Sequence, residues 1–374
     1  MLIRYLVLFL SSCGIALFIT PLLRDAAIEN GFLDQPNERK IHKKAVPRIG
    51  GIAIVISFFG SIAPGYLLFR TQLNGSITYL TGLCIGIVII SVTGIWDDLW
   101  ILVARSKLLG QIAAALILIP FGFVIRRLNL PFVGAIDISW QVGIPLTIFW
   151  VVGITNTINF IDGLDGLAAG VTVTIAAAFF IISVVSNQII MAMVCLIAAG
   201  SALGFLIYNF HPASIFMGDC GAMFLGFALA AVSVKLMFQN PSTPSSSFVP
   251  MLIFGLPIVD TTWAIMRRLR RRESPFHADS SHTHHRLVDL GFTQPRAAVI
   301  LYIASLVCIS SGVIIALKNN DMLTVILSAC ILIAVLAGTI VLSRISSSRK
   351  LPKHKIVQPS ESSRPVVRRL YKRG

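Results

Sequence analysis

The stretch ITYLTGLCIGIVIISVTGIWDDLW, residues 77–100, joins a long apolar run to the adjacent carboxylates Asp97 and Asp98. An apolar run of about 20 residues can cross the hydrocarbon core of a bilayer as one helix. Ionised carboxylates are costly in that core, and acidic residues in membrane segments commonly mark a functional path or site. The stretch therefore predicts a membrane helix that ends in a functional site.

Apolar runs of this kind recur along the whole chain. Apolar side chains make up 56% of the 374 residues, and charged side chains only 13%, against about 25% in a typical soluble domain. The pattern predicts an all-α, polytopic membrane protein of about 11 transmembrane helices. We expect them near residues 2–23, 49–70, 77–96, 107–125, 143–158, 164–184, 188–209, 220–238, 248–266, 297–317 and 322–343.

The distribution of basic residues predicts the topology. If the first span runs from outside to inside, the cytoplasmic segments hold 25 of the 31 Lys and Arg residues. The positive-inside rule then places the N-terminus outside and the C-terminus in the cytoplasm. Residues 344–374 are rich in Ser, Pro, Lys and Arg, so we expect a disordered basic tail behind an integral membrane domain, 1–343. The excess charge favours anionic membrane lipid as a partner, and no nucleic-acid-binding module is expected.

This orientation places every polar cluster on one cytoplasmic face. Besides Asp97 and Asp98, the clusters contain Lys107, Asn156, Asn159, Asp162, Asp165, Asp219, His282, His284, His285 and Arg286. Carboxylate and amide oxygens suit Mg²⁺, and Arg and His donors suit a phosphate or pyrophosphate. Each cluster also has a purely structural alternative: an interfacial helix cap at 97–98, a hydrogen-bonded seam along 156–165, a tight turn at 218–221 and a solvated histidine loop. Zinc is disfavoured, because His-x-His-His cannot easily supply three ligands.

Six stretches make the sequence recognisable, and they occur in one order on one predicted face. The stretches are GFLDQPNERKIHKKAVPRIGG (31–51), GIWDDLW (94–100) with Lys107 and Gln111 after it, NTINFIDGLDGLA (156–168), YNFHPASIFMGDCGAMFLG (208–226), PIVDTTWAIMRR (257–268) and SPFHADSSHTHHRL (274–287). They resemble the polyprenyl-phosphate N-acetylhexosamine-1-phosphate transferases, a family of membrane enzymes. The resemblance covers the chain from about Pro21 to Leu287.

The resemblance implies a reaction and its participants. Undecaprenyl phosphate attacks the sugar-linked phosphorus of a UDP-N-acetylhexosamine, most simply UDP-GlcNAc, and UMP leaves. The setting is the bacterial inner membrane with the site on its cytoplasmic face, the product starts a cell-surface glycan, and a homodimer is compatible with the family. The alternatives are another UDP-sugar or, in a different class, a membrane transporter. A transporter is disfavoured, because transporter sites lie near the midplane within repeats, whereas no repeat is visible here.

The resemblance also assigns roles to positions of this chain. Asp97 or Asp98 resembles the residue that receives the lipid phosphate, as base or orienter, and Lys107 resembles a cation serving the phosphates. Asn159 and Asp219 resemble the family's ligands of Mg²⁺, for which Mn²⁺ can substitute. The nucleotide-sugar site would be framed by Asn156, Asp162 and Asp165. The segment that closes over the pyrophosphate and sugar would contain His282, His284, His285 and Arg286.

Overall fold

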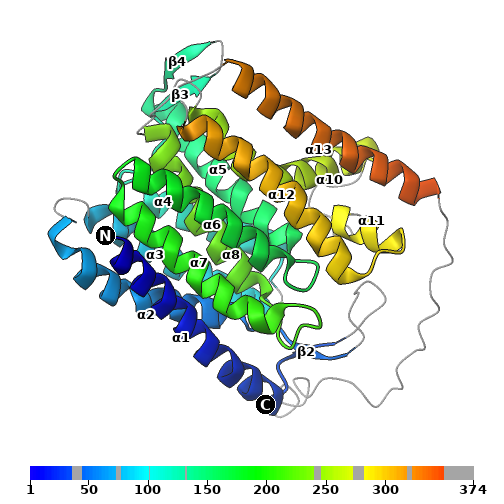
Figure 1. The fold of residues 1–374 in the computed structure, drawn as a ribbon. Helices are drawn as coiled ribbons and strands as arrows, with labels where there is room; N and C mark the ends of the chain where they lie inside the picture. Colours follow the sequence, from blue (N-terminus) through cyan, green and yellow to red (C-terminus); the bar gives the residue numbers. More distant parts are fainter. Residues whose placement is uncertain are drawn as a thin grey trace.

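The chain folds into a bundle of long helices (Figure 1). The structure is a computed structural model that describes residues 1–35, 44–72, 77–100, 102–130, 133–239, 246–272, 282–317 and 322–348. The first half holds α1 (Leu2–Glu29), α2 (Gly51–Phe69), η1 (Arg70–Gln72), α3 (Ile77–Trp100), α4 (Ala104–Leu118) and α5 (Trp140–Ile161). The second half holds α6 (Leu167–Val185), α7 (Ile189–Asn209), α8 (Gly218–Ser233), η2 (Val234–Gln239), η3 (Ser246–Phe248), α9 (Val249–Ile253), α10 (Gly255–Arg270), α11 (Thr283–Asp289), α12 (Gln294–Leu317) and α13 (Met322–Ser348).

The all-α membrane architecture is confirmed, and the number of spans comes close to the prediction. Among the described residues, nine helices are long and apolar enough to cross a bilayer. A tenth span would be the pair formed by residues 246–253 and α10, which is bent by 74°. The bend has a local cause, because Pro257 cannot donate a hydrogen bond to the carbonyl of Ile253.

One predicted span, 107–125, is not among these ten. It coincides with α4, which has only 15 residues. At 1.5 Å per residue it is about 22 Å long, shorter than the hydrocarbon core. The apolar run continues beyond it, but Pro120 lacks the N–H group that would bond to the carbonyl of Leu116 in a continuing helix. The count of eleven is therefore not confirmed.

Two short antiparallel hairpins join the helices, although the sequence predicted no strands. One pairs β1 (Leu33–Asp34) with β2 (Val46–Pro47), and the other pairs β3 (Arg127–Leu130) with β4 (Gly134–Asp137). They lie at opposite ends of the bundle (Figure 1). The chain after β2 is tied to the loop before α8, because Phe216 N donates to Pro47 O at 2.8 Å and Gly51 N donates to Met217 O at 2.7 Å.

Helix α8 is the centre of the bundle, and every one of its residues is buried. Glycines allow its neighbours to approach its backbone. A methyl group at Gly51 of α2 would collide with Gly221, and one at Gly94 of α3 would collide with Cys220. Small residues at such crossings are typical of membrane helices, which gain stability from close van der Waals packing. The N-terminus of α8 is therefore held between α2 and α3.

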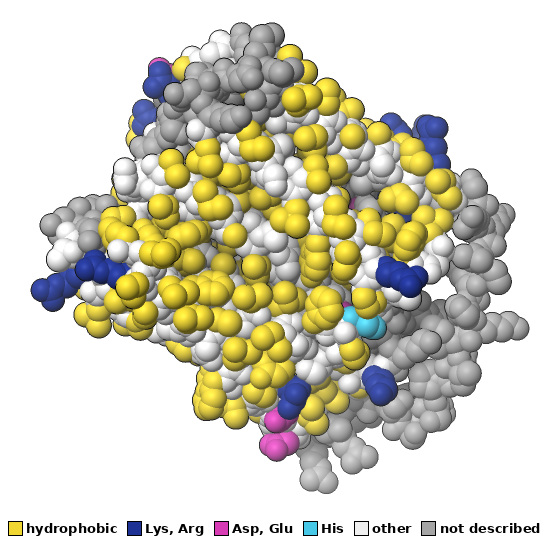
Figure 2. Space-filling model, in the orientation of Figure 1, with side chains coloured by type: hydrophobic (Ala, Val, Ile, Leu, Met, Phe, Trp, Pro, Cys, Tyr) yellow, Lys and Arg dark blue, Asp and Glu magenta, His cyan; other side chains and the backbone are white. Residues whose placement is uncertain are grey.

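The outer surface suits a lipid environment. Figure 2 shows hydrophobic side chains spread over one face of the bundle, with basic side chains toward its edges. Exposed apolar side chains include Phe18, Leu67 and Phe149, which would be costly in water as part of so large a patch. Helix α13 continues through Ser348, past the predicted boundary at 343. The remainder of the predicted tail, 349–374, lies outside the described residues.

Candidate active site

The N-terminus of α8 carries Asp219, and Asp98 from α3 binds the backbone at that point. The Asp98 carboxylate accepts hydrogen bonds from the backbone N–H groups of Asp219 at 2.8 Å and Cys220 at 2.9 Å. Gly218 precedes them with φ +69°, and a methyl group there would lie 2.7 Å from the Asp98 carboxylate. Only glycine enters this left-handed conformation without strain. Asp98 therefore caps α8 with a negative charge that complements the helix dipole.

Lys107 of α4 lies at the centre of the predicted cluster. Its Nζ is 2.7 Å from Asp219 Oδ1, 3.1 Å from Asp97 Oδ2 and 3.3 Å from Asn159 Oδ1. Asn159 Nδ2 also donates to Asp219 Oδ1 at 2.5 Å, while Asp97 Oδ1 accepts from Leu102 N at 2.7 Å. Oxygens from α3, α5 and α8 thus converge on one ammonium group.

Arg48 is a second cation in this cluster, and the sequence prediction did not include it. Its Nη2 is 2.7 Å from Asp219 Oδ2, and its Nε is 3.4 Å from Asp98 Oδ1. Burial alone would lower the pKa of Arg48, but the nearby carboxylates of Asp219 and Asp98 outweigh it and raise that pKa. Among the described residues, Asp97, Asp98 and Asp219 form ion pairs with Arg48 and Lys107, so these five groups together carry one net negative charge when all are ionised. Such a cluster attracts a further cation.

Asn156 and Asp162 lie beside this cluster. Asn156 forms a paired amide contact with Gln111, at 2.7 Å and 3.1 Å. Asp162 follows the last turn of α5 and is half-buried. Burial raises its pKa to about 7, and the negative charge of Asp219 adds to the rise. The structure therefore brings Asp162 within electrostatic reach of Asp219, as the shared site predicts.

Asp165, by contrast, is bound within the protein. Its Oδ2 lies 2.8 Å from His211 Nδ1 and accepts from Ala213 N at 3.1 Å. The neighbouring Gly166 N donates to Asn209 Oδ1 at 3.1 Å. These contacts join the α5–α6 turn to the α7–α8 loop, which leads to Asp219. In this structure Asp165 organises the loop and makes no direct contact with the Lys107 cluster.

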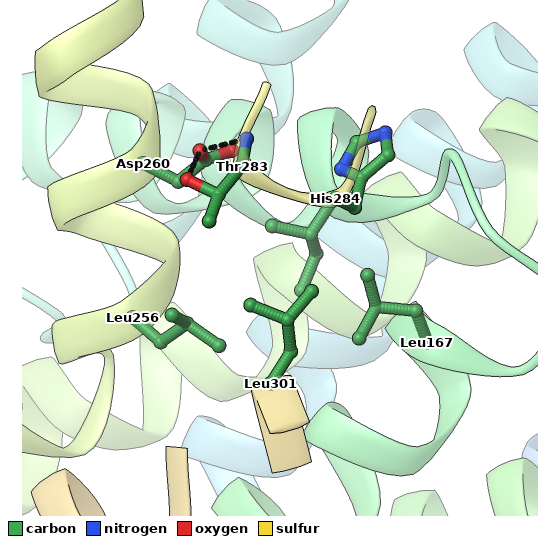
Figure 3. A pocket seen from close by; sticks show the side chains of 7 residues that line it. Leu167, Leu256, Asp260, Thr283, His284 and Leu301 are labelled. Carbon is green, nitrogen blue, oxygen red and sulfur yellow. Dashed lines mark hydrogen bonds between the residues drawn. The ribbon is translucent and has the colours of Figure 1, made fainter. Parts of the chain in front are cut away.

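The histidine segment begins α11 and is anchored by Asp260 of α10. Asp260 Oδ2 lies 2.9 Å from His282 Nδ1, and its Oδ1 accepts from Thr283 N at 2.8 Å and Thr283 Oγ1 at 2.5 Å. Figure 3 shows Asp260 and Thr283 on one side of a small cavity and His284 on the other, above Leu167 and Leu301. The cavity has a volume of about 10 Å³, close to the minimum for one water molecule.

His284 connects this segment to the rest of the site. Its ring lies against Gly163, where a methyl group would collide with Nε2. Burial, together with the adjacent His285, lowers the pKa of His284 to about 3, so the ring is neutral at physiological pH. The ring centroids of His284 and His285 are 4.3 Å apart, and Arg286 is buried in the same helix. The histidine segment therefore covers the turn that carries Asp162.

The donor set suits Mg²⁺ better than zinc. Asp97, Asn159 and Asp219 present hard oxygen atoms around the position that the Lys107 ammonium takes. Mg²⁺ usually binds one or two protein oxygens and completes its shell with water and substrate phosphates. Within the described part of the chain, no group of three or more His, Cys, Asp or Glu residues is arranged to hold a metal ion by itself. The hard oxygen donors and their small number are both consistent with a Mg²⁺ site whose coordination shell is completed by substrate oxygens.

The fold is that of a polytopic membrane protein, and the comparisons with known proteins identify it as a transferase and give its family. A model of glycosyl transferase family 4 matches residues 80–237. A probable undecaprenyl-phosphate N-acetylglucosaminyl 1-phosphate transferase of Bacillus subtilis is 35% identical over 84% of this chain and 85% of its own. The chain belongs to glycosyl transferase family 4, and the resemblance drawn from the six motifs is confirmed.

Two further relatives come from other bacterial groups. A decaprenyl-phosphate N-acetylglucosaminephosphotransferase of Mycolicibacterium smegmatis is 35% identical over 79% of this chain and 78% of its own. An undecaprenyl-phosphate alpha-N-acetylglucosaminyl 1-phosphate transferase of Escherichia coli K12 is 30% identical over 80% of this chain and 82% of its own. The similarity therefore extends over most of the chain and is not confined to one motif.

The sequence prediction assigned no site role to four residues that contact predicted site residues: Arg48, Gln111, His211 and Asp260. All four lie inside or directly beside the six quoted motifs. Arg48 was counted as a topology charge, although the pair Gly50-Gly51 after it signals a close backbone approach. Asp260 is an acid inside an apolar run, which is itself a signal of function in a membrane protein.

Proposed function

We propose that this protein transfers GlcNAc-1-phosphate from UDP-GlcNAc to undecaprenyl phosphate, at the cytoplasmic face of a bacterial inner membrane. An oxygen of the lipid phosphate attacks the phosphorus that carries the sugar. The bond from that phosphorus to the UMP oxygen breaks, and the products are undecaprenyl-pyrophosphoryl-GlcNAc and UMP. The carbon–oxygen bond of the sugar stays intact. This would be the first membrane step of a cell-surface glycan.

One observation carries this proposal: Asp97, Asp98, Asn159 and Asp219 converge with two cations at the buried N-terminus of α8. Phosphoryl transfer depends mainly on positioning and on electrostatic stabilisation of phosphate oxygens. Lys107 and Arg48 supply fixed positive charge, and the helix N-terminus adds to it. The names of the relatives, which specify a polyprenyl phosphate and N-acetylglucosamine, support the choice of substrates.

We propose Asp219 and Asn159 as the protein ligands of Mg²⁺, with Mn²⁺ as a substitute. The ion would neutralise the pyrophosphate, which otherwise brings two negative charges to a site rich in carboxylates. Lys107 contacts an oxygen of each of these two residues. Asp97, which contacts Lys107 but no backbone amide of α8, is the better placed of the two adjacent acids to orient the lipid phosphate. The histidine segment would face the sugar and pyrophosphate.

The deciding experiment is UMP release by purified protein with undecaprenyl phosphate, Mg²⁺ and a panel of UDP-sugars. We expect UDP-GlcNAc to be the preferred donor, excess EDTA to stop turnover, and Asp219→Ala to abolish it in a folded protein. Asp137→Asn, in the hairpin at the other end of the bundle, is the control and should retain full activity. Full activity in EDTA, or turnover by Asp219→Ala, would refute the proposed metal site. Preference for another UDP-sugar would change the proposed donor substrate but would leave the proposed reaction type intact.

The proposed orientation, with N-terminus outside and C-terminus inside, has its own test. Single cysteines would replace Asp289, the last residue of α11, and Val133 in the β3–β4 turn, both exposed, in a chain whose natural cysteines are changed to serine. An impermeant thiol reagent should label the first only from the cytoplasmic side and the second only from outside. Labelling of both from the same side would overturn the arrangement.

A further inference from the structure

Within the described part of the chain, Asp260 forms three hydrogen bonds, all to His282 and Thr283, the first two residues of the histidine segment. It lies on α10 and is 3% exposed. One carboxylate oxygen binds both the backbone N–H and the hydroxyl of Thr283, and the other binds His282 Nδ1. Both partners are buried as well. A buried carboxylate that binds two neighbouring residues of another helix fixes the start of that helix.

The contact also determines which nitrogen of His282 carries the proton. A carboxylate accepts hydrogen bonds, so Nδ1 of His282 must carry hydrogen to bind it. In the neutral ring the proton is then absent from Nε2, which becomes an acceptor. Phe160 stacks on His282 at a centroid distance of 5.7 Å. Thus α5 and α10 both restrain the orientation of this ring.

The restraint passes from His282 to His284 through ring stacking. The two rings are parallel to within 2°, with their centroids 5.7 Å apart. Nε2 of His284 is buried, has no hydrogen-bond partner among the residues that the structure describes, and lies against Gly163. An unpaired buried polar atom costs free energy unless a ligand satisfies it. The neutral ring is therefore prepared to bind a polar group of a substrate that enters beside the α5–α6 turn.

We propose that Asp260 is a positioning residue, which acts through His282 and Thr283 to place the His284 ring for the sugar-phosphate donor. The proposal rests on the function proposed above. Asp260 itself would contact no reacting atom. Its contribution is geometric, and a displacement of about 1 Å in a group that orients a substrate can lower the rate about a hundredfold.

Kinetics of UMP release by the full-length protein test this proposal. Asp260→Asn presents an amide to His282 and so favours the opposite ring tautomer, and we expect kcat/KM for UDP-GlcNAc to fall by about 10- to 100-fold. Thr283→Val removes only the hydroxyl contact and should cost about threefold to tenfold. Thr261→Val is the matched control, because the Thr261 hydroxyl on α10 is buried but has no hydrogen-bond partner in the described part of the chain. It should stay within about twofold of the wild type.

A double substitution separates positioning from general destabilisation. If Asp260 acts through His284, Asp260→Asn should cost less than about threefold in a His284→Ala protein, because effects along one path are not additive. A full 10- to 100-fold cost in that background would overturn the proposal. So would an Asp260→Asn protein, or a Thr283→Val protein, with wild-type kinetics.

A chemical readout keeps the inference distinct from the proposed function. Diethylpyrocarbonate modification of His282, followed by mass spectrometry, requires no turnover. We expect Asp260→Asn to increase the rate of modification by at least about tenfold, since Nδ1 loses its carboxylate partner. If the wild-type protein released no UMP from any UDP-sugar, the proposed function would fail while this measurement still tested the contact. An unchanged modification rate would refute the role of Asp260 whatever the activity.

Discussion

Asp97→Asn and Asp98→Asn should have different effects, although the two acids are neighbours and looked equivalent in the sequence. The Asp98 side chain is only 2% exposed and accepts two backbone hydrogen bonds, at 2.8 Å and 2.9 Å. Asparagine has one acceptor oxygen, so one of these N–H groups would face an NH₂ donor. The loss of a hydrogen bond to a charged acceptor costs about 1.5–3 kcal/mol. That is a factor of about 10–100 in the fraction of protein with Asp219 in place.

Asp97 loses a different kind of contact when it is replaced by asparagine. Asparagine at this position keeps the bond from Leu102 N and loses mainly the 3.1 Å ion pair with Lys107. We therefore expect Asp97→Asn to leave the melting temperature and UDP-GlcNAc binding nearly unchanged, while turnover falls by about a hundredfold or more, as when acid–base or orienting help is lost. Asp98→Asn should lower the melting temperature by several degrees and weaken UDP-GlcNAc binding by about 10–100-fold.

The assays are differential scanning fluorimetry for stability, calorimetry for UDP-GlcNAc binding in Mg²⁺, and UMP release for turnover. Wild-type stability and nucleotide binding in Asp98→Asn would refute the reading of Asp98 as the cap of α8. If Asp97→Asn also kept wild-type turnover, neither acid would serve the lipid phosphate, and the pair would be only an interfacial cap.

Three further predictions follow from the same geometry. Lys107→Met removes the cation that now occupies the cluster of oxygens, so the substrate-free protein should bind Mn²⁺ more tightly in an electron paramagnetic resonance titration, while turnover falls; weaker binding would contradict a shared position. Gly218→Ala should destabilise the protein by about 1–3 kcal/mol through its left-handed backbone, whereas Gly14→Ala, in open space on α1, should not lower the melting temperature. Gly163→Ala should lower kcat/KM about tenfold or more by displacing the His284 ring. The same change should have little effect in a His284→Ala protein. An equal loss in both proteins would show that the added methyl group does not act through the His284 ring.

The sequence predicted the general fold because hydropathy reports the energetics of burial in a membrane. It could not predict how many of the apolar runs cross the bilayer, because crossing also depends on where each helix ends. Pro120 ends α4 within an apolar run, and Pro257 bends the segment that contains α9 and α10. Both effects come from a backbone N–H group that proline lacks, which an average over about 20 residues does not register.

Several of the predicted site residues meet in the structure, but the pairing among them could not be read from the sequence. Arg48 and Asp219 are 171 positions apart and meet at 2.7 Å. Their contact depends on the backbone bonds that tie Pro47 and Gly51 to the loop before α8. Asp165 stands next to Asp162 in the motif, yet it binds His211. A motif shows which side chains a site employs, whereas the partner of each one depends on the packing of other elements.

The burial of α8 explains why the site and the fold depend on each other. Glycine contacts with α2 and α3 fix the backbone at residues 218–221, so the N–H groups that Asp98 binds are fixed points. The Asp219 carboxylate projects from that backbone and is shared by Arg48 and Lys107, one on each oxygen. Both oxygens of Asp219 are thus satisfied before any ligand arrives, and a metal ion must compete with Lys107 for Oδ1. A free divalent ion offers too few new bonds for that exchange, whereas an ion carried by a pyrophosphate brings its own oxygens and gives Lys107 a new anionic partner. On this argument metal and nucleotide-sugar should bind together, and calorimetry should detect strong Mg²⁺ binding only when UDP-GlcNAc is present.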